Sequence, residues 1–341
     1  MSRKLLSYTA ISLVLGNAAF ADVPKVAVDI APVHSLVARV MEGVGTPKLV
    51  IPAGASPHGY SLRPSEAKSL QDADMVIWMG EDLAPWMENS IETLSNNAEV
   101  ITLLEESGTK LLDFREGALF EEHDHGDHDD HDDHDKDHDD HDDHDDHDDH
   151  DKDHDDHDDH NDHDDHDEHA HGEHDPHAWL SIENAQTWLN LVAGKLSAAD
   201  PENAGVYFAN AAEARAEIDE LVKEVNNILE PVRGRNFVVF HDAYQYFETS
   251  FDFPAAGAIS LGDASDPSAA RIAEIQDRVK DEGINCVLSE PQYNPNLVTT
   301  VLSGTDAKTG VIDPLGASLE PGPNLYRDLI RNMAKSLAGC L

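Results

Sequence analysis

Histidine is the residue type whose number and position suggest chemistry in this sequence. Of the 22 histidines, 18 lie in a central acidic segment and four lie outside it. Three of those four share a context: His58 follows one apolar run, His241 ends another, and His177 comes directly after the acidic segment. Three neutral imidazoles with a carboxylate or water suit tetrahedral Zn²⁺ at about 2.1 Å, without any thiolate. The sequence therefore predicts a metal site at His58, His177 and His241.

The fourth ligand of this site is left open by the sequence. Asp313 ends the last predicted strand in the same way as His241 and is the favoured candidate, with a water or a histidine of the acidic segment as alternatives. Glu290 ends another predicted strand and is either a nearby carboxylate or a buried structural residue. His34, in the first turn of a helical pattern, is interpreted as a surface or packing residue.

Alternation of short β-branched runs with helical patterns predicts an α/β fold with two lobes around mostly parallel sheets. Strands are expected at residues 25–30, 48–51, 75–79, 99–103, 236–240, 254–259, 286–288 and 310–312. Helices are expected at residues 33–44, 64–71, 85–94, 182–196, 242–249, 268–282, 295–302 and 325–337. Ligands of such sheets bind beyond the carboxyl ends of the strands, so His58 and His241 are expected to face one interlobe cleft.

A long helix is predicted between the lobes. Asp200 can act as its N-cap, Pro201 suits its first position, and the apolar pattern continues to Leu229 before Pro231. Such a helix would be about 40 Å long and would act as a rigid rod. The predicted organisation is therefore an N-terminal lobe (22–199), a linker helix (200–231) and a C-terminal lobe (232–341).

Residues 121–175, called the acidic tract below, are an insertion in the N-terminal lobe. The acidic tract holds 31 acids and two lysines, a net charge of −29 of the −46 of the whole chain. Its Asp-Asp-His repeats lack apolar residues, which predicts a disordered loop with many weak, interchangeable sites for Zn²⁺, Ni²⁺ or Cu²⁺. We expect it to collect or sense metal, the alternative being a merely solubilising loop. Its histidines are His123, His125, His128, His131, His134, His138, His141, His144, His147, His150, His154, His157, His160, His163, His166, His169, His171 and His174.

The N-terminus is typical of a secretory signal peptide over residues 1–21. Arg3 and Lys4 precede an apolar run, and Ala19-Phe20-Ala21 offers a cleavage site. The run is too short to span a bilayer, so an uncleaved anchor is the minor alternative and no stable membrane insertion is expected. The strong acidity and the lack of a basic patch exclude nucleic acid as a partner.

The two cysteines, Cys286 and Cys340, agree with export. An even count in an oxidising compartment favours a disulfide between them, which would attach the C-terminal helix to a core strand. Two unpaired buried thiols are the alternative.

Five segments together resemble the metal-binding subunits of ABC importers of the cluster A-I type, above all the zinc-uptake members of the Gram-negative periplasm. They are residues 57–60, 175–180, 240–244, 289–292 and 312–316. The resemblance implies two α/β lobes joined by a rigid helix, with Zn²⁺ bound between them and delivered to a membrane permease. It also implies a periplasmic monomer with a disulfide.

Two positions bear on the choice of metal within this family. Zinc members carry histidine where manganese members carry glutamate at the third ligand, and here that residue is His241. Some zinc members have a glutamate directly before the first ligand, but Pro57 stands there and cannot be a ligand. Two other functions remain possible: a periplasmic metal buffer or store without a transporter, and a zinc enzyme. The enzyme is the weaker of the two, because no second substrate-binding motif is present.

Overall fold

The computed structural model describes five stretches of the chain, residues 23–115, 174–260, 268–281, 283–293 and 295–341. The predicted signal peptide and residues 121–173 of the acidic tract lie outside the described residues. No helix within the described stretches has the length and apolar character that crossing a membrane requires.

The first lobe is built on β1 (Val26–Val28), β2 (Lys48–Leu49), β3 (Met75–Trp78) and β4 (Glu99–Thr102). All neighbouring strands are parallel, and their order in the sheet is β2-β1-β3-β4. The two central strands, β1 and β3, are buried along their whole length, as is expected when helices cover both faces of a parallel sheet.

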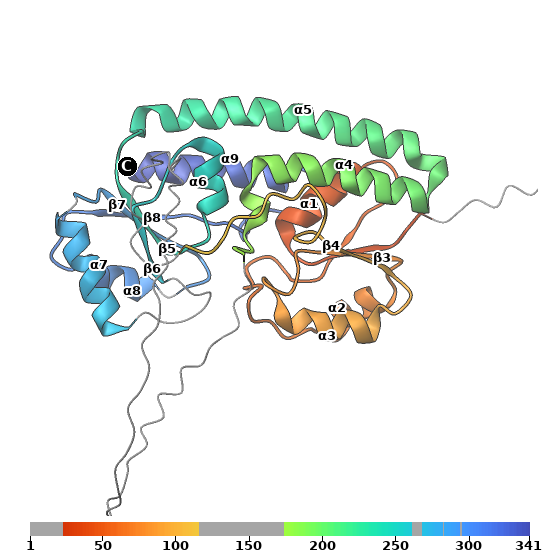
Figure 1. Cartoon of the computed structure of the whole chain (residues 1–341), viewed down its shortest axis with the longest axis horizontal. Helices are drawn as coiled ribbons and strands as arrows, with labels where there is room; N and C mark the ends of the chain where they lie inside the picture. Colours follow the sequence, from red (N-terminus) through yellow and green to blue (C-terminus); the bar gives the residue numbers. More distant parts are fainter. Residues whose placement is uncertain (1–22, 116–173, 261–267, 282, 294) are drawn as a thin grey trace, which may run out of the picture. The chain divides into compact units, whose positions relative to one another are not determined.

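Helices lie on both sides of the first sheet (Figure 1), and alternate side chains of its central strands belong to clusters with different helices. Ala27 and Val76 belong to a cluster with α2 (Pro64–Gln71) and α3 (Pro85–Leu94). Their neighbours along the strands belong to the main core together with α1 (Ala31–Val40) and α4 (Ile182–Ala199). Successive side chains of a strand point to opposite faces of the sheet, and each face is thus covered by one pair of helices.

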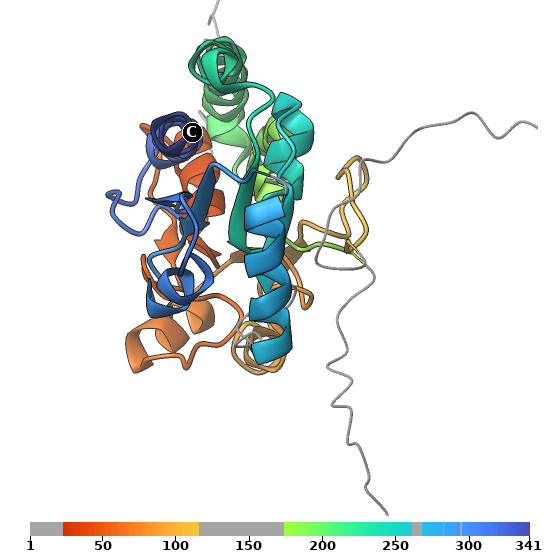
Figure 2. The same cartoon turned by 90° about the vertical axis from the view of Figure 1, so that its left-hand side faces the viewer.

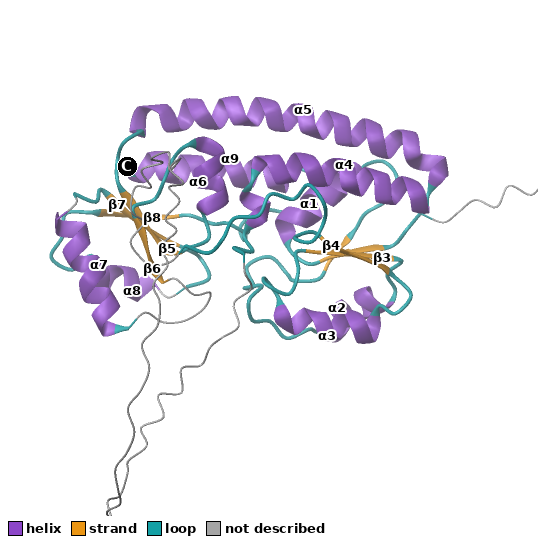
Figure 3. Ribbon diagram, in the orientation of Figure 1, coloured by secondary structure: helices purple, strands orange, loops and turns teal. Residues whose placement is uncertain are grey.

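The second lobe repeats this plan. Its strands are β5 (Phe237–His241), β6 (Gly257–Ser260), β7 (Cys286–Ser289) and β8 (Lys308–Val311). They are parallel in the order β6-β5-β7-β8, so the first strand of each lobe lies next to the second and third. Its helices are α6 (Gln245–Phe251), α7 (Ala269–Asp281), α8 (Pro295–Val301) and α9 (Leu325–Cys340). Figure 3 shows the two sheets and the helices around them.

The predicted linker helix is α5 (Ala204–Leu229), which has 26 residues and is therefore about 39 Å long. It begins later than predicted, because a 3-10 turn (Pro201–Asn203) precedes it. Asp200 holds the N-cap position of that turn, but its carboxylate accepts hydrogen bonds from the Asn203 and Tyr207 side chains instead of capping.

Helix α5 is not an isolated rod. It packs along α4, α1 and α9 (Figures 1 and 2). Helix α9 in turn contacts α1 of the first lobe, where the Tyr326 backbone N–H donates to Ser35 Oγ at 2.9 Å. One hydrophobic cluster includes residues of both lobes, so the lobes share a packed core. This arrangement favours a rigid frame over a flexible hinge.

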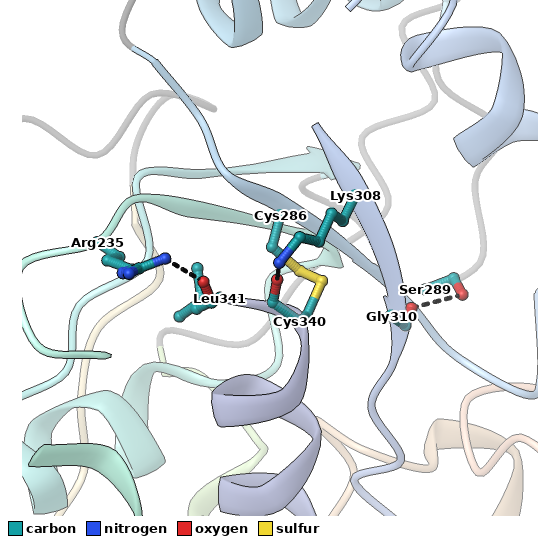
Figure 4. The surroundings of a disulfide bond; sticks show 7 residues. All are labelled: Arg235, Cys286, Ser289, Lys308, Gly310, Cys340 and Leu341. Atoms are coloured by element: carbon teal, nitrogen blue, oxygen red, sulfur yellow. Dashed lines mark hydrogen bonds between the residues drawn. A yellow bond between two sulfur atoms is a disulfide. The ribbon is translucent and has the colours of Figure 1, made fainter. Parts of the chain in front are cut away.

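The predicted disulfide is present between Cys286 in β7 and Cys340 at the end of α9, with a Cα–Cα distance of 5.7 Å (Figure 4). Lys308 Nζ donates to the Cys340 carbonyl at 3.1 Å, and the Arg235 guanidinium donates to that of Leu341. The C-terminus is thus fastened to the second sheet. Closing a loop of this length stabilises a fold by roughly 4 kcal/mol on the chain-entropy account.

Candidate metal centre

The three predicted ligand histidines lie together. Within the described stretches, His58, His177 and His241 form a group in which one ring nitrogen from each lies within 4.8 Å of the others. Their ring centroids are 5.1 to 6.1 Å apart. The Nε2 atoms of His177 and His241 are 3.3 Å apart, a separation that a single ion bound to both can span.

Each histidine comes from a different kind of element. His241 is the last residue of β5, His58 lies in the loop after β2, and His177 directly precedes the 3-10 turn Ala178–Leu180 that leads into α4. Strand β5 lies between β6 and β7, at the point where the strand order of the second sheet reverses. Ligands of open α/β sheets bind at such a point, beyond the carboxyl ends of the strands.

His177 is oriented by a carboxylate two residues before it. Asp175 Oδ1 accepts hydrogen bonds from the backbone N–H of His177 at 2.9 Å and from its Nδ1 at 2.7 Å. Both side chains are 2% exposed. A neutral imidazole that donates from Nδ1 carries its lone pair on Nε2, which is the nitrogen facing the other histidines.

His241 has the same arrangement. Its Nδ1 lies 2.6 Å from Oε1 of Glu290, which directly follows β7, the strand next to β5. Both side chains are buried, with 4% and 2% exposure. Glu290 therefore lies beside the site as a hydrogen-bond partner of His241, which combines the two roles considered for it. A carboxylate behind the imidazole fixes the tautomer and makes Nε2 a stronger ligand.

His58 is the least buried of the three and is placed by its loop. The Trp86 indole Nε1 donates to the Pro57 carbonyl at 2.7 Å, and the Trp86 ring packs against Tyr60. Helix α3 thereby holds the loop from both sides of His58. Its partial exposure makes it the one of the three histidines that faces solvent.

The walls around the histidines are largely aromatic and apolar. The Trp179 ring lies 5.2 Å from that of His177, and the Tyr293 ring lies 5.3 Å from that of His241. The pocket is lined by Ser56, Pro57, His58, His177, Trp179, His241, Glu290, Gln292, Tyr293, Pro314 and Leu315. Electrostatic interactions are stronger in such low-dielectric surroundings than in water.

Asp313 has a different environment. Its oxygens accept hydrogen bonds from the backbone N–H groups of Leu315, Gly316 and Ala317, at 3.0, 2.9 and 2.7 Å. It is not a member of the histidine group that the described stretches contain. Oδ1 accepts two of these hydrogen bonds and Oδ2 accepts one, and a carboxylate offers about four lone-pair positions, so Oδ2 keeps one that a metal could use. Asp313 as the fourth ligand stays a prediction.

The remaining predicted histidines are separated from this centre. His34 is buried in α1, and its Nε2 lies 3.2 Å from the Pro47 carbonyl, so it is a packing residue. His174 Nδ1 lies 2.9 Å from Asp113 Oδ1. The other 17 histidines of the acidic tract lie outside the described residues.

Asp175 and Trp179 are two residues of the site to which the sequence alone assigns no role. The spacing Asp-x-His could have indicated the first, because an aspartate side chain commonly accepts a hydrogen bond from the backbone N–H two residues later. The Trp179 indole donates to the Pro314 carbonyl at 2.8 Å and packs on His177. The hydrogen bond between Trp179 and Pro314 joins residues 135 positions apart, and the local sequence holds no signal for it.

Relatives with known names match the chain over nearly its whole length. A high-affinity zinc uptake system protein of Brucella abortus is 48% identical over 316 residues, which cover 93% of this chain and 91% of the relative. That of Paracoccus denitrificans is 47% identical over 339 residues and covers 98% of both chains. Both identities are high enough to establish common family membership.

Solved structures support the fold. A crystal structure of ZnuA has a TM-score of 0.69 at 19% identity, covering 94% of this chain and 99% of that chain. The solute-binding protein FpvC of Pseudomonas aeruginosa, in complex with Mn²⁺, has a TM-score of 0.70 at 18% identity, with 93% and 98% covered. The family described as zinc-uptake complex component A, periplasmic, matches residues 26–340. The chain belongs to this family of periplasmic zinc-uptake proteins.

Proposed function

We propose that this protein captures Zn²⁺ through His58, His177 and His241 and delivers it to the membrane permease of an ABC importer. The observation that carries the proposal is the convergence of three imidazoles. Two of them are buried, and each of these two is hydrogen-bonded to a carboxylate. Zn²⁺ is the solute in this proposal, so the site must bind it tightly and also release it. The family is described by zinc uptake, and transport rather than catalysis is therefore its function.

The donor set favours zinc over harder ions. Imidazole nitrogen suits Zn²⁺, whereas Mg²⁺, Ca²⁺ and Mn²⁺ prefer sites dominated by oxygen. Asp175 and Glu290 stand behind the imidazoles, where their negative charges offset the charge of a bound cation without occupying its coordination positions. The fourth position is proposed to be taken by water or by Asp313.

Membership of the family supports the proposed place of action and the proposed partner. The relatives above are named as components of a high-affinity zinc uptake system, and the family description places its members in the periplasm. We propose that residues 1–21 direct export and are removed, and that a zinc-loaded monomer docks on the permease. The acidic tract is proposed to collect zinc in weak sites near the tight one.

Competition titration with a zinc chelator tests this proposal. The full chain should hold one zinc far more tightly than any other, and the variant with all three histidines changed to alanine should lose it. The matched control is His34→Gln, because glutamine can still donate to the Pro47 carbonyl and His34 lies outside the metal centre. An undiminished tight site in the triple variant would overturn the assignment.

A further inference from the structure

Two short segments at the ends of the insertion pair with each other, and we call residues 110–115 and 174–177 the paired stem. Asp113 and His174 form an antiparallel bridge, and the Asp175 N–H donates to the Leu112 carbonyl at 2.8 Å. His177 belongs to this stem. The position of one proposed zinc ligand therefore depends on what holds the stem in place.

The hydroxyl of Tyr246 fastens both halves of the stem to α6 of the second lobe. It accepts a hydrogen bond from the Leu112 N–H at 2.9 Å and donates one to the Asp175 carbonyl at 2.9 Å. Tyr246 is 1% exposed. Rotating the side-chain amide of the neighbouring Gln245 so that its nitrogen faces the stem would let it donate to Asp175 Oδ2 at 3.2 Å and to the Asp113 carbonyl at 3.1 Å.

Arg115 makes a second attachment to the same lobe. Its guanidinium donates to Asp242 at 2.9 Å through Nε and to Glu248 at 2.8 Å through Nη1. The three side chains are between 6% and 14% exposed. A buried guanidinium that bonds two carboxylates at once fixes the positions of all three groups. Asp242 directly follows His241, so this attachment ends beside the other buried ligand.

Through these hydrogen bonds and ion pairs, the stem connects the two buried histidines of the site. The Tyr246 hydroxyl holds Asp175, and Asp175 holds the backbone N–H and the ring of His177. Arg115 ties the same stem to the residue beside His241. We propose that Tyr246 and Arg115 are positioning residues that hold His177 against His241 across the two lobes. This inference rests on the proposed function and names the contacts that hold the histidines in place before zinc binds.

Histidines that are held in place before zinc binds should change how tightly zinc is held and how fast it leaves. Ligands that are already ordered lose less conformational freedom when the ion binds, and a ligand held by neighbouring groups leaves it less readily. Loss of the stem attachments should therefore weaken binding mainly by speeding zinc dissociation. A purely structural role would lower the stability of the fold without changing the affinity of the molecules that stay folded.

Tyr246→Phe is the sharpest test, because it removes one hydroxyl and keeps the buried ring. Tyr207→Phe is its matched control: Tyr207 is also buried, and its hydroxyl donates to Asp200 at 2.9 Å, outside the zinc pocket. We expect Tyr246→Phe to weaken tight zinc binding about fivefold to tenfold, at or below the lower limit of the roughly 10- to 100-fold typical of direct partners of metal-bound histidine, because Tyr246 acts through Asp175. Tyr207→Phe should stay within about twofold of wild type, although it also loses a buried hydrogen bond.

A second variant and a spectroscopic measurement complete the experiment. Arg115→Lys keeps the charge but loses the fork that reaches Asp242 and Glu248 together, and it should increase the zinc dissociation rate. Co²⁺ bound in place of zinc should show an altered visible spectrum in Tyr246→Phe and an unaltered one in Tyr207→Phe. Unfolding of each metal-free variant is measured alongside.

The outcomes separate this inference from the proposed function. His58→Ala, titrated in parallel, should weaken tight zinc binding whatever the stem does. If it does so while Tyr246→Phe and Arg115→Lys bind like wild type, or if Tyr207→Phe loses as much as Tyr246→Phe, the positioning role is overturned alone. If His58→Ala binds zinc unchanged, the proposed function fails, and the positioning role fails with it.

Discussion

The two lobes use the same strand order but end their central strands differently. In the first lobe, Asp29 follows β1, and its carboxylate accepts hydrogen bonds from the Ile30 and Met79 N–H groups, both at 2.7 Å. Met79 follows β3, so this carboxylate joins the ends of the two central strands. In the second lobe the equivalent ends of β5 and β7 are joined by the hydrogen bond between His241 and Glu290.

The difference shows how one topology yields a structural closure in one lobe and a binding site in the other. Asp29 is completely buried, and its carboxylate accepts hydrogen bonds from backbone groups that follow the two central strands, so it closes the end of the sheet. Glu290 is bonded to an imidazole whose second nitrogen points toward two other histidines. The strand ends of a parallel sheet favour binding, but the residues placed there decide whether binding occurs.

The largest effects are expected from single histidine replacements. His177→Ala and His241→Ala should each weaken tight zinc binding by well over 100-fold, more than the loss of a hydrogen-bond partner costs. His58→Ala should cost less, because His58 is partly exposed and water can take its place. Chelator competition measures all three. Equal losses at the three positions would contradict the distinction between buried and exposed ligands.

The carboxylate in the first lobe should affect stability with a definite pH dependence. Burial raises the pKa of Asp29 from 3.8 to about 7, although the backbone N–H groups of Met79 and Ile30 lower it. The folded state then binds a proton more readily than the unfolded chain, so this stabilisation is complete below pH 3.8 and is lost as pH rises to 7. At 1.36 kcal/mol per pKa unit, the change is on the order of 4 kcal/mol.

Asp29→Asn isolates this change, because asparagine does not titrate. The difference in unfolding free energy between the metal-free wild type and this variant should favour the wild type most at pH 4 and least at pH 8. Denaturant unfolding at a series of pH values measures it. A difference that does not vary with pH would mean that Asp29 keeps an ordinary pKa in the fold.

Replacing both carboxylates by amides compares the two strand ends directly. Glu290→Gln should weaken zinc binding about tenfold or more, since the charge behind His241 is lost. Asp29→Asn should leave zinc affinity within about twofold and should lower stability near neutral pH by about 1–3 kcal/mol, because one backbone N–H loses its acceptor. Affinity and unfolding are measured for both variants. If Asp29→Asn weakened zinc as much as Glu290→Gln, the division of roles between the lobes would be wrong.

Much of the fold could be predicted from local patterns. Every predicted strand overlaps an observed one, and α2 and α3 have the predicted bounds. Helix α6 begins at Gln245 rather than at Asp242, whose carboxylate forms an ion pair with Arg115. That contact spans 127 positions of the chain, and local propensity carries no information about it.

The site was predictable to the extent that its residue types were rare. His58, His177 and His241 stood out because few histidines lie outside the acidic tract, and the strand ends gave a reason for them to meet. The groups that orient them were harder to identify. Aspartates and glutamates are abundant in this sequence, and Tyr246 reaches Asp175 only through packing of the lobes, across 71 positions.

A small effect on the tight site is also expected from removing most of the acidic tract. The bridge between Asp113 and His174 keeps the two ends of the segment together, so residues 121–173 can be replaced by a short linker without disturbing the stem. We expect the number of bound zinc ions to fall while one tight ion remains, with an affinity within about threefold of wild type. Loss of the tight ion in a folded variant would mean that the tract supplies its fourth ligand.

Acidification separates the tract from the tight site in the same pair of chains. Zinc binds unprotonated imidazole, whose reference pKa is about 6.5, so protons compete with the ion as pH falls through that value. Weak sites have less binding free energy to oppose protonation and should release their ions first. Zinc retained against a chelator, measured from pH 8 to pH 5, should therefore converge for the full-length and tract-deleted chains before the tight ion is lost. If the extra ions of the full-length chain persisted at pH 5, carboxylates rather than imidazoles would hold them, and the tract would not be a histidine-based collector of zinc.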